Sequence, residues 1–356
     1  MTSSQPTTIS LSPPGLRGGL LALCSAVLFG VSTPLVQRAG AGMGAWSTAA
    51  LLYAGAAMIG ALLRRPASRE AGVRRVDVRT LLGMTLFGAA LGPATFAWGL
   101  QHTSGAIASL LLTLEAVFTA LLSRMAFGEV MDRRIWSAML LITAGGMVLA
   151  LQAGGQGHTQ WLGLLAVLGA TVAWGVDNTL SRRVADRDPG QVVMLKAMLG
   201  TAMTAVAAIV FDEARPAIWN ALALLGIGAA GYGLSLRLYL LAQRSFGAGR
   251  TGSVFAFAPF IGAAAAFAMG DPGTPWNLAL GGSLMIAGVL LHLSEDHAHV
   301  HVHAALQHEH AHLHDDGHHT HVHDPMPVGS HSHPHDHEPI EHAHPHVPDL
   351  HHAHPH

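Results

Sequence analysis

The sequence predicts an all-α membrane protein of ten transmembrane helices, arranged as two inverted repeats of five helices. Three observations carry this prediction. Half of the 356 residues are apolar and only 11% are charged, whereas a soluble domain carries about 25% charged residues. Apolar runs long enough to cross a bilayer, about 20 residues each, recur along the chain. The arginines between these runs fall in alternate loops.

The apolar runs form two sets of five. The first run is too long for the apolar core of a cleaved signal peptide, so we interpret it as a retained helix. The connections are short and leave no room for a soluble domain. The predicted spans lie near residues 18–36, 46–63, 80–100, 105–126, 135–151, 161–180, 191–211, 219–241, 251–269 and 277–293.

These spans divide the chain into four parts. Two five-helix units occupy residues 18–152 and 161–293. The segment 1–17 is rich in Ser, Thr and Pro, and we expect it to be a disordered cytoplasmic terminus. Residues 294–356 form a histidine-rich tail.

Arginine placement predicts the orientation of the helices. Thirteen basic residues fall in alternate loops on one side of the membrane, and two fall in the opposite loops. Because positively charged loops stay in the cytoplasm, we expect the basic loops and both termini on the cytoplasmic side of a bacterial-type inner membrane. The thirteen are Arg64, Arg65, Arg69, Arg74, Arg75, Arg79, Arg133, Arg134, Arg182, Arg183, Arg187, Arg244 and Arg250, and the two are Arg38 and Arg215.

Short motifs recur at matching places in the two halves. Residues 29–35 in the first span match residues 174–180 in the sixth, and Gly128-Glu129 after the fourth span matches Gly270-Asp271 after the ninth. A repeat of five helices, an odd number, must insert its second copy upside down. Inverted repeats are typical of secondary transporters, whose substrate site lies near the bilayer midplane between the halves.

Residues of the fourth and fifth spans resemble a known family. The stretch Ser109-Leu-Leu-Leu-Thr-Leu-Glu115, continuing to Gly128-Glu129, is similar to the fourth helix of EamA-type carriers in the drug/metabolite transporter superfamily. Residues 135–146 resemble the fifth helix of these carriers, and the similarity extends over residues 18–293. The resemblance implies two five-helix repeats and export of small metabolites by an ion-coupled or facilitative route.

The chain departs from the family pattern at two places. Family members usually have proline after the glutamate, and Ala116 stands there in this chain. In the second half the proline is kept as Pro259, but Ala258 or Phe257 replaces the glutamate. Both departures bear on the substrate and on the role of Glu115.

Three ionisable residues inside the spans are candidate substrate-binding or coupling residues. Lys196, the only lysine of the chain, lies in the seventh span, Asp177 in the sixth and Glu115 in the fourth. Charged groups in hydrocarbon are costly unless they are paired or face water. Lys196 could receive a carboxylate or phosphate of the substrate, or form a structural ion pair with a carboxylate. Either carboxyl could carry a proton during transport, since burial disfavours the charged form; a hydrogen bond between helices is the alternative for Asp177.

Trp98, Trp174 and Pro259 complete the candidate site. The tryptophans could line a cavity, or they could belong to an aromatic belt at the membrane interface. A proline inside a span removes a backbone hydrogen bond and leaves a carbonyl free, which is a common device in cavity walls and hinges. Pro34 and Pro93 share this property with Pro259, and a simple kink is the alternative for each.

The sequence also limits the source of energy and the class of partner. A Walker A loop requires Gly-Lys-Ser/Thr, and the only lysine lies in Leu195-Lys196-Ala197. No serine/histidine or zinc-motif constellation appears within the spans. We expect neither an ATP-driven pump nor an enzyme, and no required cofactor. The expected partners are the lipid bilayer and a small-molecule or metal-ion substrate, with no nucleic acid and with a homodimer as a possible assembly.

The tail differs sharply in composition from the spans. All but three of the 26 histidines lie beyond residue 296, mostly in His-x-His alternation. Such a segment cannot bury an apolar core, so we expect it to be disordered without a ligand. Neutral imidazole suits divalent zinc, nickel and cobalt, although a solvated polymer without a metal role is the alternative. The candidate metal ligands are His297, His299, His301, His303, His308, His310, His312, His314, His331, His333, His335 and His337.

Three functional hypotheses follow. The leading one is a secondary transporter that exports a small metabolite, an amino acid-like or other small organic solute, while the tail binds metal as a regulator or buffer. The alternative is a nickel, cobalt or zinc exporter whose tail collects the cargo. Few metal ligands lie in the spans, which argues against this alternative, whereas the length of the tail argues for it. A metal-sensing or storage membrane protein without transport is the third hypothesis.

Overall fold

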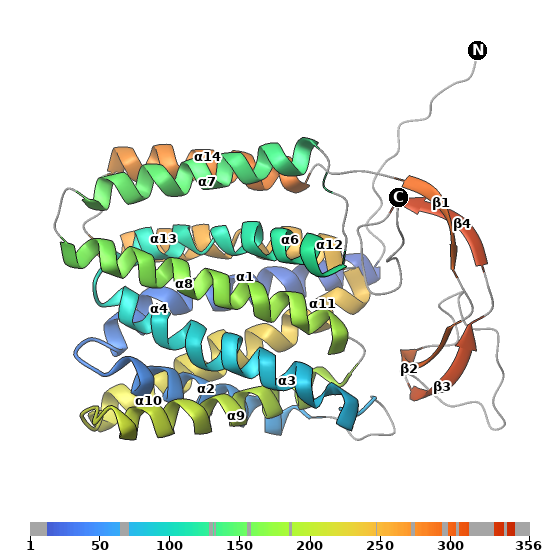
Figure 1. The fold of residues 1–356 in the computed structure, drawn as a ribbon, viewed down its shortest axis with the longest axis horizontal. Coiled ribbons are helices and arrows are strands. Elements are labelled where there is room, and N and C mark those ends of the chain that lie inside the picture. The colour runs from blue at the N-terminus through green and yellow to red at the C-terminus, as the bar shows by residue number, and fades with distance from the viewer. Residues whose placement is uncertain are drawn as a thin grey trace, which may run out of the picture.

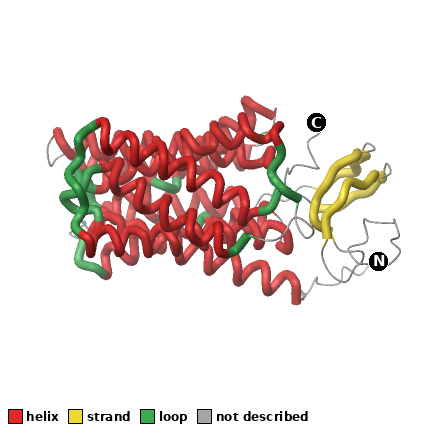
Figure 2. Tube along the Cα trace, turned by 90° about the horizontal axis from the view of Figure 1, so that it is seen from below, coloured by secondary structure: helices red, strands yellow, loops and turns green. Residues whose placement is uncertain are grey.

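Long apolar helices make up most of the chain in the computed structural model. They run side by side in a bundle, and four short strands lie beyond one end of it (Figures 1 and 2). We call this end the strand end and the opposite end the far end. The structure describes residues 13–64, 71–127, 131, 133–154, 158–184, 187–246, 248–271, 275–293, 298–303, 306–312, 331–337 and 340–345.

The first helix of the bundle begins five residues before the boundary predicted from the sequence. Helix α1 starts at Pro13, ahead of the predicted boundary at Gly18, because proline suits the first turn of a helix. Residues 1–12 lie outside the described part of the chain. The elements of this half are α1 (Pro13–Ala39), α2 (Ala45–Leu62), the 3-10 helix η1 (Arg75–Asp77), α3 (Val78–Met84), the π-helix η2 (Thr85–Leu91), α4 (Gly92–Leu100), α5 (Gly105–Leu111), α6 (Leu114–Phe127) and α7 (Arg133–Gly154).

The second half has a similar make-up. Its elements are α8 (His158–Ser181), the 3-10 helix η3 (Arg182–Val184), α9 (Pro189–Val210), α10 (Ile218–Ile227), the π-helix η4 (Gly228–Leu234), α11 (Ser235–Phe246), α12 (Ala248–Phe255), α13 (Ala258–Ala268) and α14 (Pro275–Leu293). Within the described residues, seven helical segments are long and apolar enough to cross a membrane, and two shorter apolar helices accompany them. The predicted class, a helical multi-pass membrane protein, is therefore confirmed.

Helices far apart in the sequence pack together in layers. Helices α7 and α14 pair along one side of the bundle, and α2, α9 and α10 form the opposite side (Figure 1). Between these layers, α1 packs against α11 and α13, while α8 packs against α4 and α6. Residues from both halves therefore meet in the centre of the bundle.

Two segments of the bundle are interrupted near their middle. The chain turns at Leu112–Thr113 between α5 and α6, and at Ala256–Phe257 between α12 and α13. Glu115 thus lies in the first turn of α6, where a carboxylate is favoured by the helix dipole. Pro259 occupies the first turn of α13, where its missing N–H has no intrahelical partner to lose.

The tail contains four strands in the part that the structure describes. Strand β1 (Ala298–His303) pairs antiparallel with β4 (Ile340–Pro345), and β2 (Leu306–His312) pairs antiparallel with β3 (His331–His337). These pairings differ from the disorder expected for the tail. The alternation of histidine with other residues has the two-residue period of a strand, which accounts for the difference. His297 and His314 lie outside the described residues.

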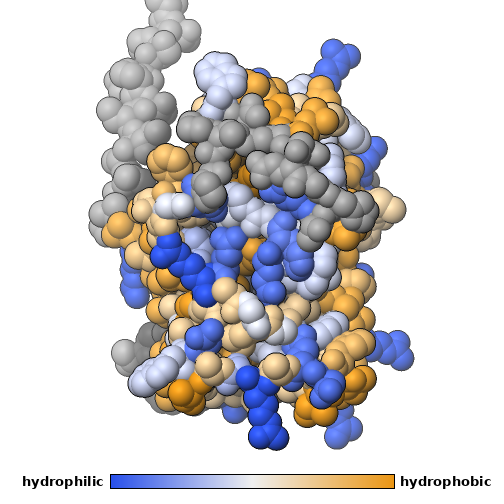
Figure 3. All heavy atoms as spheres, turned by 90° about the vertical axis from the view of Figure 1, so that its left-hand side faces the viewer, coloured by the Kyte–Doolittle hydropathy of each residue, from blue (hydrophilic) through white to orange (hydrophobic). Residues whose placement is uncertain are grey.

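Acidic side chains hold helix starts at the far end of the bundle. The Glu213 carboxylate accepts hydrogen bonds from the backbone N–H groups of Trp46 (3.1 Å) and Ser47 (2.7 Å), in the first turn of α2. Asp271 accepts one from Ala106 (3.1 Å) at the start of α5. Both contacts satisfy N–H groups that a helix leaves free at its start. Figure 3 views this end, where hydrophilic side chains gather across the middle of the face.

Glycines allow the backbones of α2 and the α10–η4 segment to approach closely. A Cβ atom at Gly55 would overlap the backbone at Leu225 and Ala229, whereas one at Gly226 would meet open space. Gly55 is buried and Gly226 is exposed.

We expect Gly55→Ala to lower the melting temperature in detergent, because α2 and α10 must separate to admit the methyl group. The matched control Gly226→Ala should leave the melting temperature unchanged or raise it, since alanine favours a helix by about 1 kcal/mol over glycine. Equal effects of the two substitutions would contradict the close packing of α2 against α10.

Candidate functional site

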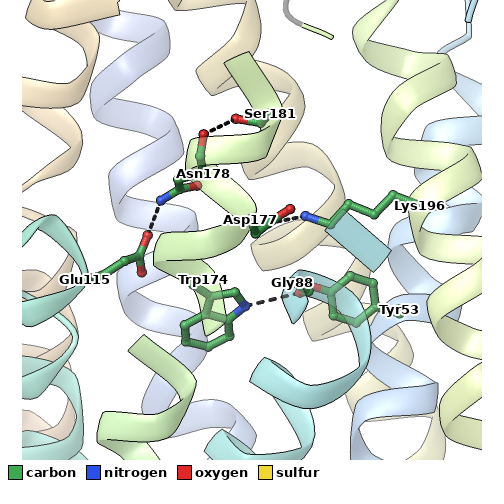
Figure 4. A network of polar contacts seen from close by, with 8 residues as sticks. All are labelled: Tyr53, Gly88, Glu115, Trp174, Asp177, Asn178, Ser181 and Lys196. Carbon is green, nitrogen blue, oxygen red and sulfur yellow. Dashed lines mark hydrogen bonds and ion pairs between the residues drawn. The ribbon is translucent and has the colours of Figure 1, made fainter. Parts of the chain in front are cut away.

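Eight residues from five helical segments form a polar network inside the bundle (Figure 4). Four of them, Glu115, Asp177, Lys196 and Trp174, are candidates from the sequence. We call this set the central polar network. Its members are Tyr53 of α2, Gly88 of η2, Glu115 of α6, Trp174, Asp177, Asn178 and Ser181 of α8, and Lys196 of α9.

A buried ion pair joins α8 to α9. The Lys196 ammonium group donates to Oδ2 of Asp177, and the two residues are only 5% and 7% exposed. Gly88 has no side chain, and a Cβ atom there would overlap the Asp177 carboxylate. The pair therefore depends on glycine at position 88. Because each charge compensates the other, neither adds net charge to the core.

Pro93, five residues after Gly88, leaves the Gly88 carbonyl without a hydrogen-bond donor in its own helix. Within the π-helix η2, the N–H of Gly92 bonds to the carbonyl of Phe87, and the next residue, Pro93, has no N–H. The Gly88 carbonyl therefore lacks a donor within its own helix. Tyr53 Oη donates to it from α2, and Trp174 Nε1 donates to it from α8 at 3.2 Å. Pro93 thus leads to a contact that ties three segments together.

Glu115 and Asn178 form the less buried side of the network. Asn178 Nδ2 donates to Glu115 Oε1 at 2.5 Å, and the Asn178 carbonyl accepts from Ser181 Oγ at 2.8 Å. Glu115 is partly exposed and Asn178 is exposed, in contrast to the buried ion pair. No ion-pair partner of Glu115 is found among the described residues. The arrangement offers one accessible carboxylate beside a neutralised pair.

Seven aromatic rings, two of them from members of this network, contact one another and form what we call the aromatic cluster. Phe29 lies at its centre, with ring centroids 6.3 Å from Trp174, 5.9 Å from Tyr232 and 5.5 Å from Phe255. All three tyrosines of the chain belong to the cluster. Its members are Phe29, Tyr53, Phe96, Trp174, Tyr232, Tyr239 and Phe255.

The remaining sequence candidates lie outside the network. Trp98 is 36% exposed near the end of α4, where it stacks on His102 at a centroid distance of 3.9 Å. This position fits the aromatic-belt alternative. Pro259 is buried at the start of α13. Its neighbours Ala258 and Gly262 lie so close to α1 that a Cβ atom at Gly30 would overlap them.

Metal ligands do not gather among the residues whose side chains the structure describes: no three His, Cys, Asp or Glu side chains lie close enough to share an ion there. The tail histidines in β1 to β4 are placed by backbone register alone. His299 and His301 stand opposite His344 and His342 in one pair of strands.

Sequence reasoning missed several members of the site. Tyr53 and Tyr232 carry a signal in the sequence, because the chain has only three tyrosines and all three lie in predicted spans. Asn178 is adjacent to Asp177 and shares a helix face with Trp174, four residues earlier. The role of the Gly88 carbonyl follows from Pro93 only once the π-helix is known.

Comparison with known proteins agrees with this architecture. The profile of the EamA-like transporter family matches residues 16–151 and again residues 161–294. An uncharacterized transporter of Methanothermobacter thermautotrophicus is 25% identical over 234 residues, which cover 64% of this chain and 68% of that protein. A crystal structure of a protein aligns with a TM-score of 0.56 and 20% identity, covering 80% of this chain and 96% of the other, and so shares the fold.

The buried ion pair predicts strong coupling between its two residues. Asp177→Asn and Lys196→Gln should each lower stability by about 3–5 kcal/mol, because each leaves one charge buried and unpaired. The double variant should lose much less than the sum of the single losses, since an amide pair carries no net charge. Unfolding curves of the four proteins in mixed detergent micelles measure this coupling. Additive losses would show that the two side chains do not interact.

Proposed function

The chain belongs to the EamA-like transporter family, and on that basis we propose that it is a secondary transporter that exports a small organic solute from the cytoplasm. The observation that carries the proposal is Glu115, a partly exposed carboxylate inside a bundle of membrane-spanning helices. An ionisable residue at such a depth is a functional residue by default. Glu115 is the residue to which we assign substrate binding or ion coupling.

Inverted repeats of five helices each are part of this proposal. The family profile matches the chain twice, and each match contains one π-helical segment in its third span, η2 and η4. Each match also contains one interrupted span, α5–α6 and α12–α13. Discontinuous helices at corresponding places in two halves are characteristic of transporters with a site between the repeats.

The pattern of burial supports entry of the solute from the strand end. All seven residues of α5 are buried, whereas α6, which begins at Leu114, is mostly partly exposed or exposed. At the far end, Gln37 Nε2 donates to the carbonyls of Leu100 (2.8 Å) and Thr103 (2.9 Å), which ties α1 to the loop before α5. If the arginine-rich loops lie in the cytoplasm, as we propose, the strand end faces the cytoplasm and the solute enters from there.

Metal binding by the tail is a second proposal, supported by the strand register. His308, His310 and His312 stand opposite His335, His333 and His331 in the β2–β3 pair. Residues directly opposite in an antiparallel pair lie on the same face, so histidines accumulate on one face of each pair. We assign zinc, nickel or cobalt to this tail as a regulator or a buffered ion. Export of the same ions as cargo is the competing function.

Flux measurements in inside-out membrane vesicles test both proposals together. We expect uptake of a small organic solute by the full chain and by a variant ending at Ser294, because the proposed path lies in the helices. Glu115→Gln should abolish the uptake, whereas Glu213→Gln, the same change at the far end, should preserve it.

Nickel, cobalt and zinc flux in the same vesicles decides between regulator and cargo. Metal flux that survives truncation at Ser294 would make the protein a metal exporter. Absence of flux for every solute, in protein shown to be folded, would contradict the transport proposal itself.

A further inference from the structure

Within the described residues, one ionisable side chain of the central polar network has no oppositely charged partner. Lys196 and Asp177 neutralise each other, so the pair presents no net charge to a ligand. Glu115 is held by the neutral side chain of Asn178. Arg237 is the other buried basic residue in the described spans. It lies beside Gly190 at the start of α9, and Gly190 is about 9 Å along α9 from Lys196. The ionisable group that a ligand meets beside Asn178 is therefore a carboxyl group.

The aromatic cluster includes a side chain of α8, the helix that also carries Asn178. Trp174 and Asn178 are four residues apart on α8 and share a helix face, so the Trp174 ring lies about one helical turn from the side chain that holds Glu115 (Figure 4). Phe29, Tyr239 and Phe255 are partly exposed within the cluster. The faces of aromatic rings attract cations and repel anions. A carboxylate beside such rings therefore selects for positive charge.

One buried hydroxyl group in the cluster has no partner of its own. Tyr232 is 7% exposed, and its Oη atom makes no hydrogen bond within the described residues. A buried hydroxyl without a partner carries a cost of about 1–3 kcal/mol. A bound polar group would remove that cost. Tyr232 therefore offers a hydrogen bond to a ligand that reaches the centre of the cluster.

We propose that the site takes an organic cation: a monovalent amine with an apolar body, whose ammonium group binds the Glu115 carboxylate while its body packs on the aromatic cluster. This inference rests on the proposed function and deepens it by naming the class of substrate. Of the two roles that the sequence left open for Lys196, it favours the structural ion pair, because Lys196 is already engaged by Asp177 and is not available to a substrate carboxylate.

Three ligands with the same phenyl body and different charges test the proposal. Phenethylamine is a cation at neutral pH, phenylalanine is a zwitterion and phenylpropionate is an anion. We expect their affinity for the detergent-purified full chain, measured by tryptophan fluorescence, to fall in that order. Glu115→Gln should weaken phenethylamine binding at least about tenfold. Glu115→Asp, which keeps the charge, should restore part of the affinity, and Glu213→Gln should leave it unchanged.

The outcomes separate this inference from the transport proposal. Tightest binding of phenylpropionate, or unchanged amine binding in Glu115→Gln, would overturn the assignment of an organic cation and would leave a transporter of another substrate class. The charge series in the wild-type chain decides this even if Glu115→Gln fails to fold. Binding of phenethylamine without flux of any solute in vesicles would support the cation site and contradict the transport proposal.

Discussion

Mutual neutralisation of Lys196 and Asp177 is the interaction on which the rest of the core depends. A bilayer offers no water to an unpaired charge, so the only lysine of the chain must carry its own counter-ion. The pair joins α8 to α9 and requires the missing side chain of Gly88. Because the ion pair occupies both Lys196 and Asp177, Glu115 remains as the one carboxyl group of the network without a charged partner among the described residues. The function that we propose follows from this carboxyl group of Glu115.

A single proline explains how the polar network is held in place. Pro93 deprives the Gly88 carbonyl of an intrahelical donor, and Tyr53 and Trp174 supply donors from two other helices. The same tryptophan joins the aromatic cluster and shares a helix face with Asn178. A local backbone defect therefore fixes the positions of Tyr53 of α2 and Trp174 of α8 around the Gly88 carbonyl. Defects of this kind persist in membranes only where neighbouring groups satisfy the freed backbone.

The sequence predicted the helical membrane class and most helix positions, because apolar runs and arginine placement report directly on the solvent around each segment. It also identified Glu115, Asp177 and Lys196, since charges in apolar runs are rare. It left open whether Lys196 pairs with Asp177 or with Glu115, because the choice depends on how α8 and α9 both pack against η2. It could not predict the π-helical shape of η2. Trp98 was grouped with Trp174 by residue type alone, and only the fold separates the two. The strand pairing of the tail was missed because its composition indicates disorder.

The central claim, that Glu115 is the accessible carboxyl group and that Asp177 is sequestered by Lys196, can be tested chemically. Dicyclohexylcarbodiimide partitions into membranes and forms adducts with carboxyl groups that it can reach. Mass spectrometry of the full chain after treatment should show an adduct on Glu115 and none on Asp177, and Asp177 should react only once Lys196→Gln has removed its partner. Modification of Asp177 in the wild-type chain, with Glu115 unmodified, would contradict the account.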